Sequence, residues 1–421
     1  MQALVDQAVA GGIAPGIVIG VVIDGKTFIV AAGKTSDQDT KPPDATTLFE
    51  IGSVTKTFTS TLLAAMVVEK KLTLETPLSA VWPGFTVTGD EVRLVDLATH
   101  HSGFPPMPAN FAPRDLTNPY ADYTLAHLDH ALHTQGLAKS GTPPYAYSNF
   151  AVSVLGQALA KAADSTFGAL VTSKILVPLK MNDTQVDVPR GHATRVAQGH
   201  DRDGLATSPW DFQAAAPAGA IRSTARDMLR YAEAQLGAKG PLAEAIALTH
   251  VPVADAPNHG KVALGWHLTG HGLIWHNGET GGFHTFLGID AVHNRAVIVL
   301  ANAAGMATDA LGAAAFVVLD GKAPELPTMP TEVTLPAGAL DGLVGRYLLQ
   351  PDVEVTVTQK DGQLFEQLTG QPALRLHPSS ATQFYLRVVE AQVTFELGPD
   401  GKARSLTIFQ GGQTHVAVRA P

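Results

Sequence analysis

The residues with the clearest capacity for chemistry are a serine and a lysine three positions apart, Ser53 and Lys56. Apolar residues recur at helical spacing after them, over 57–72, without proline or glycine, which predicts a helix. Ser53 is then expected at the helix N-terminus, with Lys56 one turn later on the same side. Free backbone N–H groups and the helix dipole favour negative charge there, and a neutral amine can accept the serine proton. The pair therefore predicts a nucleophilic serine, although the four-residue pattern by itself also fits a helix-capping serine beside a solvated lysine.

Two later segments offer partners for such a serine, which needs a proton shuttle, a group that orients the substrate and donors for an oxyanion. Tyr147 and Asn149 lie two apart in an extended segment before a predicted helix, so their side chains share a face. His276, Gly278 and Glu279 end a predicted strand that has small residues, which permit close approach to the backbone. Considered singly, these residues also fit a packed aromatic ring, a helix N-cap and a strand-end histidine.

The three segments together resemble a known family. Their order and spacing are similar to those of the three motifs of class C β-lactamases and their relatives: Ser53-x-x-Lys56, Tyr147-Ser148-Asn149 and His276-Asn277-Gly278. Those relatives include low-molecular-mass penicillin-binding proteins, D-aminopeptidases and family VIII carboxylesterases. The resemblance covers about residues 1–320, and the C-terminal region resembles the lipocalin-like domain that some members carry.

This resemblance implies a role for each motif. Ser53 would form the acyl-enzyme, Lys56 would activate it, and Tyr147 would relay the proton to the leaving group. Asn149 would hold the substrate amide or carbonyl, and the backbone N–H groups of Ser53 and Glu279 would form the oxyanion hole. The resemblance implies no metal and no organic cofactor. The formal base, Lys56 or Tyr147, stays open, because the two would titrate as a coupled pair.

The third motif departs from the β-lactamase pattern. Class C β-lactamases usually have lysine where this sequence has His276, and a permanent cation suits a carboxylated substrate. Histidine is mostly neutral at pH 7, and Glu279 adds negative charge beside Gly278. His-x-Gly resembles the D-aminopeptidase and peptidase-like branch. We therefore expect His276, Gly278 and Glu279 to contact small esters or amides, including D-amino-acid peptides, with weak β-lactam hydrolysis.

Three alternatives follow from the same resemblance. The first is a true class C-type β-lactamase or a D,D-carboxypeptidase. The second is an acyltransferase, because an alcohol or amine can intercept an acyl-enzyme. The third is a penicillin-binding or cell-wall-binding module that is acylated without turnover.

Composition argues against several other classes. The 421 residues carry a net charge of −9, which gives no reason to expect nucleic acid or an anionic membrane as a partner. The sequence has no cysteine, so thiolate catalysis and cysteine-ligated zinc are excluded. His127, His130 and His133 share a helical face but lack the carboxylate pattern of a metal site. The pair His100-His101 is predicted to belong to a structural turn rather than to the catalytic machinery.

The N-terminal region bears on the compartment. The uncharged run 8–23 is short for a membrane span and contains Pro15 and several glycines. Asp6 interrupts the apolar start that a signal peptide would need. We expect a periplasmic or secreted bacterial protein if a signal segment has been removed, and a cytoplasmic one otherwise. The sequence does not indicate an oligomeric state.

The pattern of elements predicts an α/β protein of the α+β type. β-runs precede and follow a helical segment, about 75–217, which predicts one antiparallel sheet with flanking helices and a second, all-helical lobe. Together they would form a β-lactamase/transpeptidase-like hydrolase domain of residues 1–321. Residues 322–336 carry four prolines and are predicted to be a linker. Short alternating strands over 337–421 predict a C-terminal antiparallel β domain resembling a small barrel.

Overall fold

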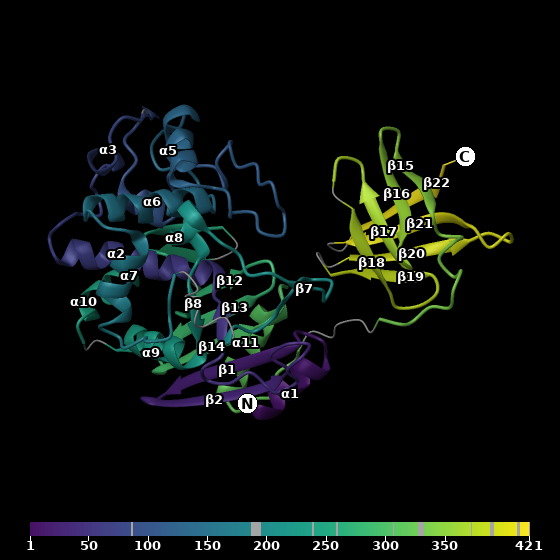
Figure 1. Cartoon of the computed structure of the whole chain (residues 1–421), viewed down its shortest axis with the longest axis horizontal. Coiled ribbons are helices and arrows are strands. Elements are labelled where there is room, and N and C mark those ends of the chain that lie inside the picture. Colours follow the sequence, from purple (N-terminus) through teal and green to yellow (C-terminus); the bar gives the residue numbers. More distant parts are fainter. Residues whose placement is uncertain are drawn as a thin grey trace. The chain divides into compact units, whose positions relative to one another are not determined.

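The computed structural model describes residues 1–85, 87–186, 195–237, 240–257, 260–305, 307–326, 332–371, 373–387, 391–410 and 413–420. The chain forms two compact units, Met1–Pro327 and Thr328–Pro421 (Figure 1). This division lies inside the predicted linker, of which residues 327–331 fall outside the described residues. Each unit has its own apolar core.

An eight-stranded antiparallel sheet organises the first unit, in the order β2-β1-β14-β13-β12-β11-β10-β9. Its strands are β1 (Gly16–Ile23), β2 (Lys26–Gly33), β9 (Ala254–Ala256), β10 (Gly260–Ala263), β11 (Trp266–Leu268), β12 (Ile274–Glu279), β13 (His284–Asp290) and β14 (Arg295–Ala301). The sequence predicts the β1–β2 hairpin correctly, because Asp24 and Gly25 both adopt the positive φ that a tight two-residue turn requires. The last strand of this unit, β14, pairs with the first, β1.

Helices cover both faces of this sheet. Alternate residues of β1 belong to different cores, because successive side chains of a strand point to opposite faces. Ile17 and Ile19 pack with α1 (Gln2–Ala10) and α11 (Ala307–Leu319), while Val18 belongs to the larger core that includes α9 (Ala225–Leu236). The predicted antiparallel sheet with flanking helices is confirmed.

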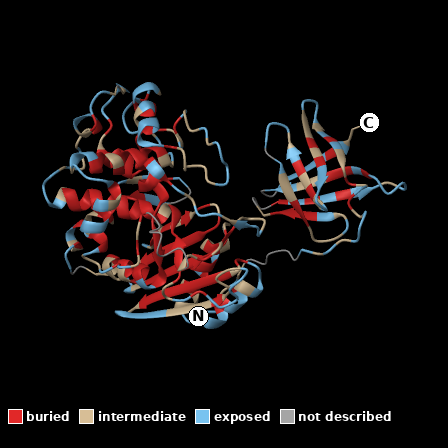
Figure 2. Cartoon of the chain, viewed as in Figure 1, coloured by how far each residue is buried: buried red, intermediate tan, exposed pale blue. Residues whose placement is uncertain are grey.

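The second lobe of this unit is mainly helical. Its helices are α2 (Thr55–Val68), α3 (Leu78–Val81), α4 (Leu94–Ala98), α5 (Leu125–Thr134), α6 (Asn149–Ala162), α7 (Phe167–Val171), α8 (Ala216–Gly219) and α10 (Ala243–Thr249). Short strand pairs add to them: β3 (Leu48–Glu50) with β8 (Arg222–Thr224), β4 (Thr88–Gly89) with β5 (Ala138–Lys139), and β6 (Gly199–His200) with β7 (Ala206–Thr207). Helices α2 and α6 are mostly buried (Figure 2). The helix predicted after Ser53 starts earlier and ends earlier than expected, at Thr55 and Val68.

The second unit is a closed barrel of eight antiparallel strands in sequence order. They are β15 (Gly345–Gln350), β16 (Val353–Lys360), β17 (Gln363–Leu368), β18 (Leu374–Pro378), β19 (Gln383–Leu386), β20 (Ala391–Leu397), β21 (Ala403–Gln410) and β22 (Gln413–Arg419). Alternate residues such as Val355 and Val357 fill its interior. The predicted barrel-like β domain is confirmed.

The barrel interior contains a carboxyl group that weakens it as pH rises towards neutral. Glu366 lies opposite the core residue Val357, and its Oε2 has no hydrogen-bond partner among the described residues. Burial raises the pKa of Glu366 to about 7, so the folded state holds this proton more tightly than the unfolded state does. Folding stability should therefore fall as pH rises from about 4.5 to 7, by about 3 kcal/mol. Thermal melts from pH 5 to 8 should show this loss for the barrel transition, and Glu366→Gln should abolish it. Equal pH dependence in both proteins would contradict the prediction.

Candidate active site

The corner between β3 and α2 presents the predicted serine. Gly52 has φ +49°, and a Cβ at that position would lie 2.7 Å from the Glu279 backbone nitrogen, so only glycine fits the turn. A single 3₁₀ turn, Gly52–Val54, then leads into α2 and carries Ser53. The Lys56 Nζ lies 2.8 Å from the Ser53 Oγ and 2.7 Å from the carbonyl oxygen of Ala218. The structure thus brings the predicted serine and lysine into direct contact.

The Lys56 side chain is buried in the core between the two lobes. Burial holds the pKa of its ammonium group well below the usual value. No ion pair of Lys56 with a carboxylate occurs within the described part of the chain. A neutral amine can donate to the Ala218 carbonyl and still accept a hydrogen bond from the Ser53 hydroxyl. The geometry therefore suits a lysine that removes the serine proton.

Tyr147 is the third group at this corner. The Lys56 Nζ lies 5.0 Å from the centre of its ring. Burial raises the pKa of Tyr147 above its ordinary value, against a smaller opposing effect of the nearby Ser53 hydroxyl. The phenol is therefore protonated at neutral pH and is suited to donate a proton rather than to take one first.

The turn that carries His100 packs against Tyr147 and accepts hydrogen bonds from the residues on either side of it. The His100 backbone oxygen accepts from the Ala146 N–H at 2.9 Å, and its Nδ1 accepts from the Ser148 N–H at 3.1 Å. The imidazole and phenol ring centres lie 4.5 Å apart. The sequence correctly placed His100 in a turn but gave no sign that this turn holds both neighbours of Tyr147.

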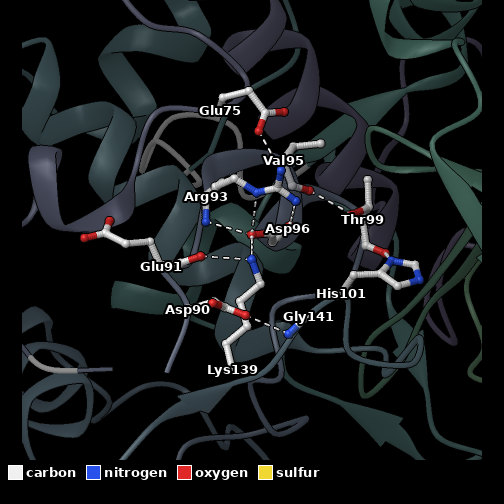
Figure 3. A network of polar contacts seen from close by, with 10 residues as sticks. All are labelled: Glu75, Asp90, Glu91, Arg93, Val95, Asp96, Thr99, His101, Lys139 and Gly141. Atoms are coloured by element: carbon white, nitrogen blue, oxygen red, sulfur yellow. Dashed lines mark hydrogen bonds and ion pairs between the residues drawn. The ribbon is translucent and has the colours of Figure 1, made fainter. Parts of the chain in front are cut away.

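A buried ion-pair network anchors this turn (Figure 3). The Asp96 carboxylate accepts hydrogen bonds from the Lys139 Nζ at 2.6 Å and from Arg93 at 2.7 Å. The backbone oxygen of the same Asp96 accepts from the His101 N–H at 3.0 Å. Because α4 leads directly into the turn, the network fixes where the His100 ring lies.

Asn149 begins α6 one position after the capping residue. Ser148 is the N-cap, because its Oγ accepts from the Ala151 N–H at 2.9 Å. The Asn149 side chain is therefore not used for capping, contrary to one expectation from the sequence. Its amide contacts the Met107 sulfur at 3.9 Å, and the Tyr120 hydroxyl contacts the same sulfur at 3.9 Å.

The third motif, at the end of β12, packs against the serine corner. A Cβ on Gly278 would overlap the Ile51 carbonyl oxygen and would lie 2.8 Å from the Ser53 nitrogen. His276 is buried, and its Nδ1 donates to the Asn277 carbonyl oxygen. Its Nε2 has no hydrogen-bond partner among the described residues. Burial, assisted by nearby His267 and Lys56, holds the pKa of His276 well below 6.5, so the imidazole is neutral.

Glu279 presents its backbone and its side chain in different directions. The Thr280 N–H donates to the Phe283 oxygen, so the next pair, Glu279 with His284, is a non-hydrogen-bonded pair of the antiparallel ladder. The Glu279 N–H consequently points away from β13 and lies beside Gly52. The carboxylate instead bonds Arg202 at 2.6 Å and His284 at 2.9 Å. Arg202 and His284 thus compensate the charge of Glu279. Its carboxylate does not lie on the side of β12 that carries His276, contrary to the expectation from the sequence.

The described residues offer neither a metal site nor a membrane-spanning helix. They contain no group of three or more His, Asp or Glu side chains placed to hold a metal ion. Of the three histidines on one face of α5, His127 serves as a cap, because its Nδ1 bonds the Thr124 N–H at 3.2 Å. None of the described helices is both long enough and apolar enough to cross a bilayer.

Comparison with known proteins agrees with this geometry. The β-lactamase family model matches residues 1–322, and the model of a domain of unknown function (DUF3471) matches residues 329–418. Penicillin-binding protein 4* of Bacillus subtilis (strain 168) is 26% identical over 412 residues, which span 90% of this chain and 89% of that protein. A β-lactamase of Lysobacter lactamgenus is 32% identical over 270 residues, 62% of this chain and 64% of that enzyme.

A solved structure gives the same answer for the fold. The D-alanine carboxypeptidase AmpC from Burkholderia cenocepacia superimposes with a TM-score of 0.63 at 26% identity, over 76% of this chain and 97% of that one. The family model covers more than half of the chain, and the relatives cover both the sheet and the helical lobe. The chain therefore belongs to the β-lactamase family of serine hydrolases.

Proposed function

We propose that this protein hydrolyses small esters and amides, including D-amino-acid derivatives, through an acyl-enzyme on Ser53, and that its substrates need no carboxylate. The observation that carries the proposal is the 2.8 Å contact between the Ser53 hydroxyl and a buried amine, Lys56, whose charged form is disfavoured. Such an amine can take the hydroxyl proton at neutral pH as the oxygen attacks.

The remaining groups divide the later steps between them. As the Ser53 Oγ bonds to the carbonyl carbon, its proton passes to the Lys56 Nζ. The backbone N–H groups of Ser53 and Glu279, which lie on either side of Gly278, stabilise the resulting oxyanion. Tyr147 donates its proton to the leaving group and recovers one from Lys56. Water then attacks the acyl-enzyme ester on Ser53. The same proton transfers run in reverse, and the carboxylic acid is released.

The side of the site that His276 and Gly278 form, here called the third-motif wall, supports a preference for substrates without a carboxylate. His276 is neutral, and its only hydrogen is directed to the Asn277 carbonyl. The Asn277 amide donates to the Asp309 carboxylate at 2.7 Å, on the opposite face of β12. The His276 side chain thus offers neither a positive charge nor a free donor, whereas a carboxylated substrate would need one. Small esters and amides without a carboxylate, including amides of D-amino acids, therefore suit this wall better than β-lactams do.

A panel of chromogenic substrates tests this proposal. p-Nitrophenyl acetate, p-nitrophenyl butyrate, D-alanine p-nitroanilide and nitrocefin should be compared on the wild type and on Ser53→Ala. We expect turnover of the esters to exceed that of nitrocefin. Nitrocefin turnover equal to that of the best ester would favour the second candidate, a β-lactamase, which the similarity to the Lysobacter lactamgenus enzyme supports. A burst of one equivalent without turnover would indicate a penicillin-binding module instead.

Because the His276 side chain is neutral, a further prediction concerns the His276→Lys variant. A lysine at this position would place a cation where a substrate carboxylate would lie, as the β-lactamase resemblance implies. We expect the ratio of kcat/KM for nitrocefin to that for p-nitrophenyl butyrate to rise about tenfold, the value of one charged hydrogen bond. His276→Gln, which keeps the wall neutral, should leave the ratio within a factor of about three. A similar ratio in all three proteins would show that this position does not set the preference.

A further inference from the structure

Four charged side chains form a chain of contacts on the face of β12 that points away from Ser53. The Glu279 carboxylate accepts from Arg202 at 2.6 Å, from the Gly305 N–H at 3.1 Å and from the His284 Nδ1 at 2.9 Å. The His284 Nε2 in turn lies 2.9 Å from the Asp309 Oδ1. His284 is buried, whereas the two carboxylate side chains are about a quarter exposed.

This chain holds the third motif on both sides of its glycine. Residues 277 and 279 share one face of β12, because side chains alternate along a strand. Asp309 bonds Asn277 directly and bonds Glu279 through His284. Asp309 itself lies in the first turn of α11, where the helix dipole favours an acidic side chain. Side-chain hydrogen bonds thus link helix α11 to the residues that flank Gly278, and the helix itself packs against β13 and β14 (Figure 1).

The position of the Glu279 N–H depends on this arrangement. Gly278 packs against Ile51 and Ser53, and the Thr280 N–H donates to Phe283, but the Glu279 N–H itself donates no ladder bond to β13. β11 pairs with β12 only at residues 274 and 275, so it does not fix the strand end either. An oxyanion donor is effective only when it is held at a set distance from the developing charge.

We infer that His284 and Asp309 are positioning residues that hold the end of β12 so that the Glu279 N–H stays beside the Ser53 N–H. The inference rests on the proposed function, in which these two N–H groups stabilise the oxyanion. Neither side chain contacts the substrate. Both act through Glu279 and Asn277.

We call the contacts that join Arg202, Glu279, His284 and Asp309 the clamp. Because His284 can lose a proton, the effect of the clamp on activity should depend on pH. Only an imidazolium can donate to Glu279 and Asp309 at the same time. Burial opposes that charge, but the hydrogen bonds to Asp309 and Glu279 outweigh it and raise the pKa of His284 to about 9. Arg202 is the remaining charge of the cluster, and it pairs with Glu279. The clamp is therefore complete below about pH 9 and loses its central donor above it.

Three variants of the full chain test the inference with p-nitrophenyl butyrate. Asp309→Asn and His284→Gln each break the chain of charges, and Asp320→Asn is the control. Asp320 directly follows the C-terminal end of α11, whereas Asp309 lies in the first turn of that helix. Asp320 pairs with Arg295 at 2.7 Å. We expect kcat to fall about 10- to 100-fold in the two clamp variants, with KM within about threefold, because a misplaced oxyanion donor affects the transition state. The control should keep wild-type values.

The pH profile separates positioning from simple loss of stability. The wild type should lose kcat above about pH 9, Asp309→Asn should shift this limb to lower pH, and His284→Gln should lack it. Asp309→Asn keeps the size of the side chain, so it remains informative if His284→Gln does not fold. Unchanged kcat in a folded Asp309→Asn, or a wild-type limb that persists in His284→Gln, would overturn the inference.

The outcome is distinguishable from failure of the proposed function. The titration of His284 can be followed by NMR in Ser53→Ala, which has no nucleophile. A charged imidazole up to about pH 9 would support the clamp whatever reaction the site performs. If Ser53→Ala stayed active while the clamp variants lost rate, the acyl-enzyme would be wrong and the positioning role would need another reaction.

Discussion

Ser53→Ala is expected to lower kcat for p-nitrophenyl butyrate by about 10⁴-fold or more, with the fold intact. The hydroxyl is the atom that would form the acyl bond, and it lies 2.8 Å from the amine that would take its proton. No other serine has a lysine three positions later, so no neighbouring hydroxyl can replace it. Mass spectrometry of the wild type with a slow ester should show an added acyl group on the peptide that contains Ser53. The adduct should be missing from the variant.

Ser60→Ala is the matched control for this experiment. Ser60 lies on the same helix two turns later and is buried, so its replacement tests the effect of losing a hydroxyl from α2. We expect its activity to stay within about threefold of the wild type. Comparable losses in Ser53→Ala and Ser60→Ala, or an acyl adduct on another serine, would contradict the assignment.

The parts of this site that the sequence predicts are those fixed by local geometry. The spacing of Ser53 and Lys56 needs only a helical turn to bring the two together, and the structure supplies it. The position of Tyr147 beside Lys56 joins distant segments, and only the motif order that the family resemblance provides led to that prediction.

Other parts of the site depend on contacts between distant segments. The clamp joins Arg202, Glu279, His284 and Asp309, which come from one loop, two strands and one helix. No local pattern marks these residues, because polar residues at strand ends and in a first helical turn are common. The charge of Glu279 was predictable, but the direction of its side chain was not, since the direction depends on the register of β12 with β13.

His100 illustrates the same limit inside a recognised motif. The family resemblance placed His100 in a structural turn, and in the structure the residue has a positive φ there. The hydrogen bonds that it accepts from residues on both sides of Tyr147 join segments 46 and 48 positions apart. Sequence reasoning gave it a structural role, and the structure adds which catalytic candidate that role supports.

Lys56→Arg should be nearly as damaging as loss of the serine, with kcat reduced about 10³-fold or more for esters and amides alike. A guanidinium keeps the positive charge and the hydrogen-bonding capacity of lysine, but it does not release its proton at any ordinary pH. If Lys56 served only to stabilise charge on a Tyr147 phenolate, arginine would retain much of the rate. The raised pKa of Tyr147 and the depressed pKa of Lys56 argue that the amine is the base instead.

Tyr147→Phe completes this test, because the two side chains are assigned different steps. A p-nitrophenolate leaving group departs without a proton, whereas the amine released from D-alanine p-nitroanilide is better expelled when it is protonated. Acylation of Tyr147→Phe by the ester, followed as the first turnover, should therefore stay within about tenfold of the wild type, while anilide cleavage falls by about 10²- to 10⁴-fold. If Tyr147 were the base that activates Ser53, both reactions would fall together, and Lys56→Arg would be the milder change. The contrast between ester and anilide thus decides which of the two groups takes the serine proton first.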